Sequence, residues 1–248
     1  MIARERHGDI EVVRLEHGKV NELDLELLLA IGECFGELAQ EDARAVVLTG
    51  TRKVFSAGAD LIRVLNEGEV YVRESLPVLS AAFLSVFSFP RPVVAAINGH
   101  AIAGGAVFAL ACDHRIMSGG MFGLAELRVG VPFPVAAIEI VRYALGAKGL
   151  QEAVYFGENY PAQEAWRRSL VDELVEPDLL LPRALEEAER MANIPTASFS
   201  HVKAQLRRPV LERIERDAPK HDPDAARIWH SDDARGAIRR FLDDLARR

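Results

Sequence analysis

The chain has 248 residues, 49% of them hydrophobic, and a formal net charge of −7. This length and hydrophobic content are sufficient for the core of one large domain, or of a domain with an appendage. The negative net charge argues against a nucleic-acid partner. The first residues are charged and no apolar run of about 18 residues is present, so we expect a soluble cytoplasmic protein with no membrane partner.

Apolar periodicity predicts strands that alternate with helices in the first half of the chain. The expected elements are a strand at 12–15, a helix over 23–38, a strand at 45–48, a helix over 72–87, a strand at 92–97 and a helix at 106–111. The last of these is apolar on every face, which indicates a buried helix. Alternation of this kind predicts an α/β fold with a mostly parallel sheet covered by helices.

The second half of the chain is predicted to be mainly helical. Asn159 and Pro161 are typical of a helix start before a helix at 162–169, and a last strand is expected at 170–175. From residue 178 on we expect only helices, with breaks at Pro195 and within 219–223, and with Asp222 capping the final helix. We predict an α/β core over residues 1–190 and a C-terminal helical region over 191–248.

Cysteine and histidine usage gives no sign of a metal centre. Cys34 and Cys112 both lie in apolar periodic segments, where buried thiols are expected. The seven histidines are scattered, with neither H-E-x-x-H nor Cys-x-x-Cys spacing. We therefore expect no metal site.

Two small-residue turns, each directly after an apolar strand-like run, are the most informative feature of the sequence. The first is Phe55-Ser56-Ala57-Gly58-Ala59-Asp60, and the second runs from Asn98 to Gly105. Such turns can bring backbone N–H groups against a ligand, and the second lies at the positive end of the buried helix. Glycines that only let this helix pack closely on the sheet are the alternative. The second turn lacks the Lys and Ser/Thr of a P-loop.

The best candidate for an acid or base is Glu126, within the segment Phe122-Gly123-Leu124-Ala125-Glu126-Leu127-Arg128-Val129-Gly130. Apolar surroundings raise the pKa of a carboxyl group toward the range useful for proton transfer at neutral pH. The alternative is an exposed glutamate paired with Arg128.

The two turns and the Phe-Gly-x-x-Glu segment together resemble the crotonase superfamily, the enoyl-CoA hydratase/isomerase family, over roughly Ile10 to Val175. The resemblance implies a spiral of ββα units followed by a C-terminal helical region that packs against neighbours in a homotrimer or a dimer of trimers. It also implies an acyl-CoA thioester substrate and no separate cofactor, because coenzyme A is part of the substrate.

The resemblance further implies roles for individual residues. The N–H groups of Ala59 and Gly104 would hold the thioester oxygen, and Glu126 would be catalytic. Asp113 would accept structural hydrogen bonds, and Lys53 and Arg63 are candidate phosphate partners. The coenzyme A and substrate-binding residues would be Val20, Asn21, Leu23, Ser56, Ala57, Asp60, Leu61 and Gly105. Phe133 stands in a proline-flanked segment where this chain departs from the family pattern, and its ring is expected to form an apolar wall of the acyl pocket.

One departure from the family pattern bears on the reaction. Hydratases of this family carry a second glutamate three residues after the oxyanion glycine, and Val107 stands there in this chain. Hydration uses two carboxylates efficiently, whereas moving a double bond between the 3 and 2 positions needs one. This favours a Δ3-Δ2-enoyl-CoA isomerase. A hydratase, another enolate reaction and a non-catalytic acyl-CoA-binding protein remain alternatives, and Glu139 is a weaker candidate for a second acid, with a surface glutamate as the ordinary interpretation.

Overall fold

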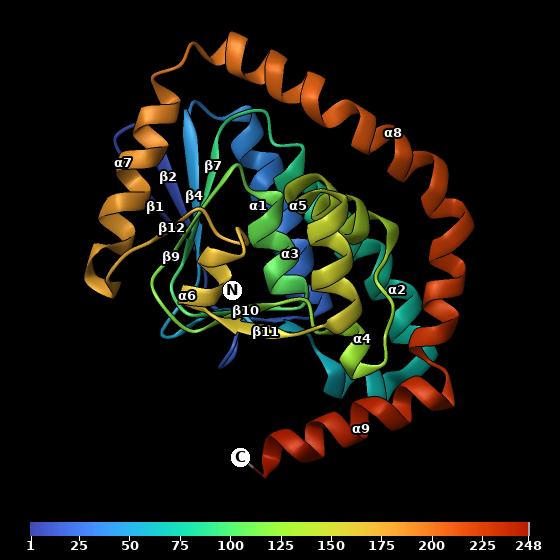
Figure 1. Ribbon diagram of the computed structural model, residues 1–248. Coiled ribbons are helices and arrows are strands. Elements are labelled where there is room, and N and C mark those ends of the chain that lie inside the picture. Colours follow the sequence, from blue (N-terminus) through green and yellow to red (C-terminus); the bar gives the residue numbers. More distant parts are fainter. Residues whose placement is uncertain (248) are drawn as a thin grey trace.

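The computed structural model describes residues 1–247, and its centre is a six-stranded sheet (Figure 1). The strand order is β1-β2-β4-β7-β9-β12, in which only β1 is antiparallel to its neighbour. The bounds are β1 Ile2–His7, β2 Ile10–Leu15, β4 Ala45–Thr49, β7 Val93–Ile97, β9 His114–Met117 and β12 Glu173–Leu174. Every residue of β4 and β7 is buried, as expected for parallel strands covered on both faces.

A second sheet of four short strands has the order β11-β10-β8-β5, and β3 pairs with β6 in a small third sheet. The bounds are β3 Glu22–Leu23, β5 Val54–Ser56, β6 Gly58–Ala59, β8 His100–Ile102, β10 Met121–Gly123 and β11 Asn159–Pro161. The chain sends one strand to the large sheet and the next to the four-stranded sheet, and then forms a helix. This happens three times in succession, which is the spiral of ββα units that the family resemblance implied.

Helices cover both faces of the large sheet (Figure 1). The helices are α1 Leu25–Gln40, α2 Leu61–Phe87, α3 Gly104–Ala111, α4 Glu126–Val129, α5 Val135–Phe156, α6 Ala162–Arg167, α7 Leu180–Ala192, α8 Thr196–Trp229 and α9 Asp232–Ala246, with a 3₁₀ turn at Pro177–Leu179. Alternate strand residues face opposite sides: Val47 and Val94 pack against α7, whereas Val46 and Ala95 belong to the main core with α1 and α3.

The long helix α8 departs from the sequence prediction. It continues through Pro219 and Pro223, where a break was expected, and bends around the core (Figure 1). The expected break at Pro195 is confirmed, because α7 ends at Ala192 and α8 begins at Thr196. Asp222 does not cap the final helix, because its carboxylate accepts a hydrogen bond from the N–H of Val135, 2.8 Å away, at the start of α5. The final helix, α9, instead begins after Ser231, whose hydroxyl oxygen accepts from the N–H of residue 234.

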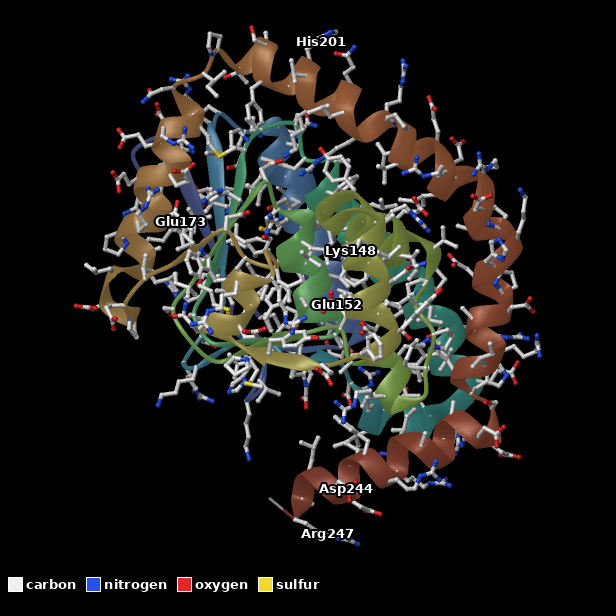
Figure 2. The ribbon with its side chains drawn as sticks, in the orientation of Figure 1. Lys148, Glu152, Glu173, His201, Asp244 and Arg247 are labelled. Carbon is white, nitrogen blue, oxygen red and sulfur yellow. The ribbon has the colours of Figure 1, made fainter. Side chains whose placement is uncertain are left out.

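A buried ion cluster fixes α8 to the sheet. Asp113 accepts from the N–H of Val93 at 2.8 Å, from Lys203 Nζ at 2.6 Å and from Arg207 at 2.6 Å. The prediction that Asp113 is a structural acceptor is confirmed. Figure 2 shows His201 on the outer side of α8 near this cluster, and Asp244 at the other end of the C-terminal region, near the end of α9.

Two other local predictions were right only in part. The helix begins at Ala162 as predicted, with Pro161 as its N-cap residue, but it ends at Arg167. Asn159 does not cap it, because this residue belongs to β11, which pairs antiparallel with β10. Only Glu173 and Leu174 of the expected strand at 170–175 are extended and paired. Both cysteines are buried free thiols, as predicted. Among the described residues, one helix, α2, is long and apolar enough to cross a membrane. This is weak evidence for a membrane span, because buried core helices share the property.

Candidate active site

The two glycine turns and Glu126 meet at one small cavity of about 60 Å³. Ala59 reaches it from β6, Gly104 from the first position of α3 and Glu126 from the first position of α4. The remaining lining is apolar and consists of Ala57, Leu61, Leu79, Phe83, Ile102, Ala103, Ala125, Val129, Val131, Pro132, Pro134, Ala137, Trp229 and Phe241. The structure therefore brings together three residues that are distant in the sequence, since Ala59 and Glu126 are 67 positions apart.

The two turns touch each other directly, and glycine is needed for this contact. Gly58 has a φ of +87°, and a Cβ added there would lie 2.9 Å from the Ala103 side chain and 3.3 Å from the Gly104 nitrogen. A Cβ added at Gly104 would lie 2.7 Å from Leu23 Cδ1. A side chain at Gly58 would push the turns apart, and one at Gly104 would displace the Leu23 side chain, so the glycines serve close packing as well as any ligand.

Strain marks the entry to α3. Ala103 has φ +53° and ψ −124°, a conformation that non-glycine residues rarely adopt. Its N–H donates to the carbonyl of Gly123 at 2.8 Å, which ties the turn to β10. Gly104 follows as the first helical residue, and the N–H at that position of a helix has no intrahelical acceptor. Strained backbone of this kind is common where a structure presents a main-chain group to a ligand.

Glu126 is the chemically distinctive residue of the cavity. It is 8% exposed, and its Oε2 has no hydrogen-bond partner within residues 1–247. Burial raises the pKa of this carboxyl group to about 8, and the hydrogen bond from its own N–H lowers it to a lesser extent. The alternative of an exposed Glu126 paired with Arg128 is wrong, because the carboxyl is buried and Arg128 is exposed.

The predicted coenzyme A residues divide into two groups. Ala57 and Leu61 line the cavity beside Ala59. Leu23 lines a neighbouring cavity, and Gly105 is buried under the Ser56 carbonyl, where a Cβ would approach to 2.4 Å.

The polar members of the predicted set hold the first turn in place. The Asn21 amide donates to the carbonyl of Phe55 at 3.1 Å, and the Ser56 hydroxyl donates to the carbonyl of Asn21 at 2.8 Å. Asp60 caps α2 by accepting from the N–H groups of residues 62 and 63. Val20 accepts from the N–H of residue 57 at 3.0 Å through its carbonyl. Substrate contacts of these four residues stay a prediction.

Two other candidates lie away from the cavity. Phe133 packs into the core at 8% exposure, and its neighbours Pro132 and Pro134 line the cavity in its place. Glu139 is held by Arg142 at 3.0 Å and by Arg213 of α8 at 2.7 Å, so it joins α5 to α8 and is not a second acid of this site.

The candidate phosphate partners differ in how they are engaged. Arg63 forms ion pairs with Glu26 and with Glu67, and its guanidinium stacks 4.6 Å from the centre of the Tyr71 ring. Its charge is thus balanced within the chain. Lys53 is exposed just before β5 and stays a candidate.

Sequence reasoning missed Trp229 and Phe241, which reach the cavity from α8 and α9. Nothing in their local sequence marks them as lining residues. Their positions follow from the way the two C-terminal helices wrap around the core (Figure 1).

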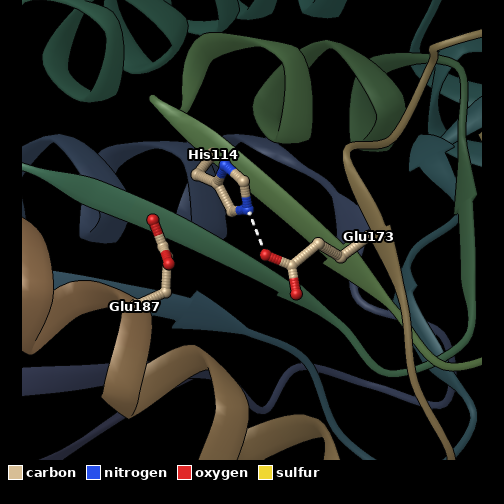
Figure 3. Close-up of side chains that lie close together, drawn as sticks. All are labelled: His114, Glu173 and Glu187. Atoms are coloured by element: carbon tan, nitrogen blue, oxygen red, sulfur yellow. Dashed lines mark hydrogen bonds and ion pairs between the residues drawn. The ribbon is translucent and has the colours of Figure 1, made fainter.

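A cluster of His114, Glu173 and Glu187 has its ligand-type atoms within 4.8 Å of one another, away from the cavity (Figure 3). Arg183 donates to Glu173 at 2.8 Å and to Glu187 at 3.1 Å, and Arg190 also donates to Glu187. The hydrogen bond from Arg190 lowers the pKa of Glu187. These arginines balance the carboxylates, so the cluster is an ion-pair network that joins α7 to the sheet.

The comparisons with known proteins agree with this geometry. The profile of the family described as "Enoyl-CoA hydratase/isomerase" matches residues 5–245. A Thermus thermophilus protein provisionally named an enoyl-CoA hydratase is 38% identical over 198 residues, 77% of this chain and 78% of the relative. The mitochondrial enoyl-CoA delta isomerase 1 of Rattus norvegicus is 27% identical, over 86% of this chain and 76% of the relative.

A similar fold occurs in solved structures. The human mitochondrial delta3-delta2-enoyl-CoA isomerase superposes with a TM-score of 0.94 at 24% identity, covering 99% of this chain and 98% of that chain. The fold is therefore the crotonase fold. The chain belongs to the enoyl-CoA hydratase/isomerase family, whose members act on acyl-CoA thioesters.

Proposed function

We propose that this protein is a Δ3-Δ2-enoyl-CoA isomerase that uses Glu126 as its single proton carrier. The observation that carries the proposal is the composition of the cavity. Among the lining residues, all of which lie in the part of the chain that the structure describes, Glu126 alone has a titratable side chain. The family's second glutamate is replaced by Val107, which is fully buried in the core.

The proposed reaction uses each part of the site once. The Glu126 carboxylate takes a proton from C2 of a 3-enoyl thioester, and the electron pair moves toward the thioester oxygen to form a dienolate. The N–H groups of Ala59 and Gly104 stabilise the charge on that oxygen. The protonated Glu126 then delivers the proton to C4, which leaves the double bond at position 2. One carboxyl group suffices because it gives back the proton that it took.

The raised pKa suits this shuttle. A carboxyl group with a pKa of about 8 is a stronger base than an ordinary glutamate, and about a tenth of it carries the charge needed for proton abstraction at pH 7. Hydration would instead need a water molecule activated on one carbon while a proton is delivered to the next. The apolar lining offers no second group for that task.

The test is an assay of purified protein with 3-enoyl-CoA and, separately, 2-enoyl-CoA. We expect isomerisation of the first, lowered about 10²- to 10⁴-fold in kcat by Glu126→Gln, with exposed Glu189→Gln of α7 as the matched control. Hydration of 2-enoyl-CoA without isomerisation would favour a hydratase. Binding of both esters with turnover of neither would favour a non-catalytic acyl-CoA-binding protein.

A further inference from the structure

A second, smaller cavity lies beside the candidate active site. It measures about 10 Å³, which is room for about one water molecule. Its lining comes mainly from α2 and consists of Leu23, Leu28, Ala59, Val64, Tyr71, Ser75, Leu76, Leu79 and Trp229. Most of these side chains are apolar.

The two cavities share three lining residues, Ala59, Leu79 and Trp229. Ala59 has only a methyl side chain. The bulk of the shared wall is therefore the Leu79 side chain of α2 and the Trp229 indole at the end of α8. A smaller side chain at either position would join the two spaces.

Trp229 is held firmly in this wall. It is 4% exposed, and its Nε1 donates a hydrogen bond to the carbonyl of Pro132 at 2.8 Å. Pro132 itself lines the active-site cavity. The hydrogen bond satisfies the only polar atom of the indole and fixes the ring against rotation. A fixed ring closes the space beyond it, unlike a flexible side chain that could move aside.

The active-site cavity that this wall bounds is small. Its volume of about 60 Å³ is that of a few water molecules. We propose that Trp229, together with Leu79, ends the acyl pocket and restricts the protein to short acyl chains. The proposal rests on the proposed function in one respect, that the acyl chain enters the cavity beside Glu126.

The test measures equilibrium binding of saturated acyl-CoA esters from butanoyl to dodecanoyl by calorimetry. The affinity of the wild-type protein is expected to rise with chain length among the shortest esters and then to stay constant for the longer ones. In Trp229→Leu each further methylene that becomes buried should tighten binding about fourfold. The ratio of dodecanoyl to butanoyl affinity should therefore rise by about tenfold or more. Trp229→Phe, which keeps a ring but loses the donor, should give a smaller rise.

A matched control and an independent variant complete the experiment. Trp166 of α6 is 47% exposed and lies outside both cavities, so Trp166→Leu should leave the ratio unchanged. Leu79→Ala opens the wall from α2 and should raise the ratio even if the Trp229 variants do not fold. Circular dichroism shows which variants are folded.

Isomerisation of the matching 3-enoyl esters separates this proposal from the proposed function. One outcome is that the variants shift the ratio of dodecanoyl to butanoyl affinity although the wild-type protein isomerises none of the 3-enoyl esters. That result would support the proposal that Trp229 and Leu79 end the acyl pocket and would count against the isomerase function. If the enzyme is active and the folded Trp229→Leu and Leu79→Ala variants keep the wild-type chain-length profile, only the proposal about the end of the acyl pocket is overturned. Wild-type affinity that climbs steadily to dodecanoyl-CoA also overturns it.

Discussion

Replacing Glu126 by glutamine should stabilise the protein in a strongly pH-dependent way. Burial raises the pKa of this carboxyl group from its ordinary value of 4.5 to about 8. A raised carboxyl pKa means that the folded state holds the proton more tightly than the unfolded chain does. The free energy of unfolding is therefore highest below pH 4.5, where the carboxyl group is neutral in both states. It falls as the pH rises from 4.5 to about 8, and this group changes it no further above that value.

The size of the effect follows from the same two values. Their difference corresponds to about 5 kcal/mol between the acidic and the alkaline limits. Glutamine has nearly the same shape but cannot ionise, so Glu126→Gln should match wild type at about pH 4 and exceed it in stability at about pH 9. For a chain of this length, a difference of that order raises the thermal midpoint by about 10 °C or more.

The assay is thermal unfolding of wild type and Glu126→Gln at a series of pH values, followed by circular dichroism. Glu189→Gln, which changes an exposed glutamate of α7, serves as the control and should follow the wild-type curve. Parallel curves for wild type and Glu126→Gln would refute the reasoning. They would show that the carboxyl is solvated in the folded protein and that its pKa is not raised by burial. Stabilisation with loss of activity would be the pattern typical of a functional residue.

Three further predictions concern the surroundings of the site. Gly104→Val should lower kcat at least about 100-fold, because its side chain would collide with Leu23, crowd Phe83 beside the cavity and displace an N–H donor; wild-type kcat in a folded variant would contradict this. Val107→Glu should lower the thermal midpoint without creating hydratase activity, since residue 107 is buried in the core and lies outside the cavity; a hydration assay checks it. Asp113→Ala should cost about 3–5 kcal/mol in urea unfolding, because Lys203 and Arg207 would lose their buried partner. A loss below about 1 kcal/mol would argue against that network.

The sequence was sufficient for the parts of the site that depend on backbone geometry. Gly58 is needed where the two turns come into contact, and Gly104 where the start of α3 packs against Leu23. Such a need is visible as small residues after apolar strands. Glu126 could be found because a single carboxyl in an apolar segment is conspicuous. The alternation of strand and helix likewise predicted the mostly parallel sheet covered by helices, since periodicity reports which face of each element is buried. The ββα spiral was implied only by the family resemblance.

Local signals failed where distant segments supply the deciding contact. Asp222 precedes a proline, as a capping residue often does, yet its carboxylate caps α5 because α8 passes alongside that helix. Asn159 has the chemistry of a helix cap, but the free edge of β10 pairs with it as a strand. In both cases a tertiary partner offered a better hydrogen bond than the local helix start.

The sequence by itself determined the turns, the buried helix behind them and the lone carboxyl group, because those features follow from steric freedom and local polarity. Only the tertiary structure decided what closes the cavity. Trp229 and Phe241 are separated from Glu126 by about a hundred positions, and their place in the wall depends on the path of α8 and α9 around the core. Packing between distant helices selects which side chains meet, and no local pattern encodes that choice.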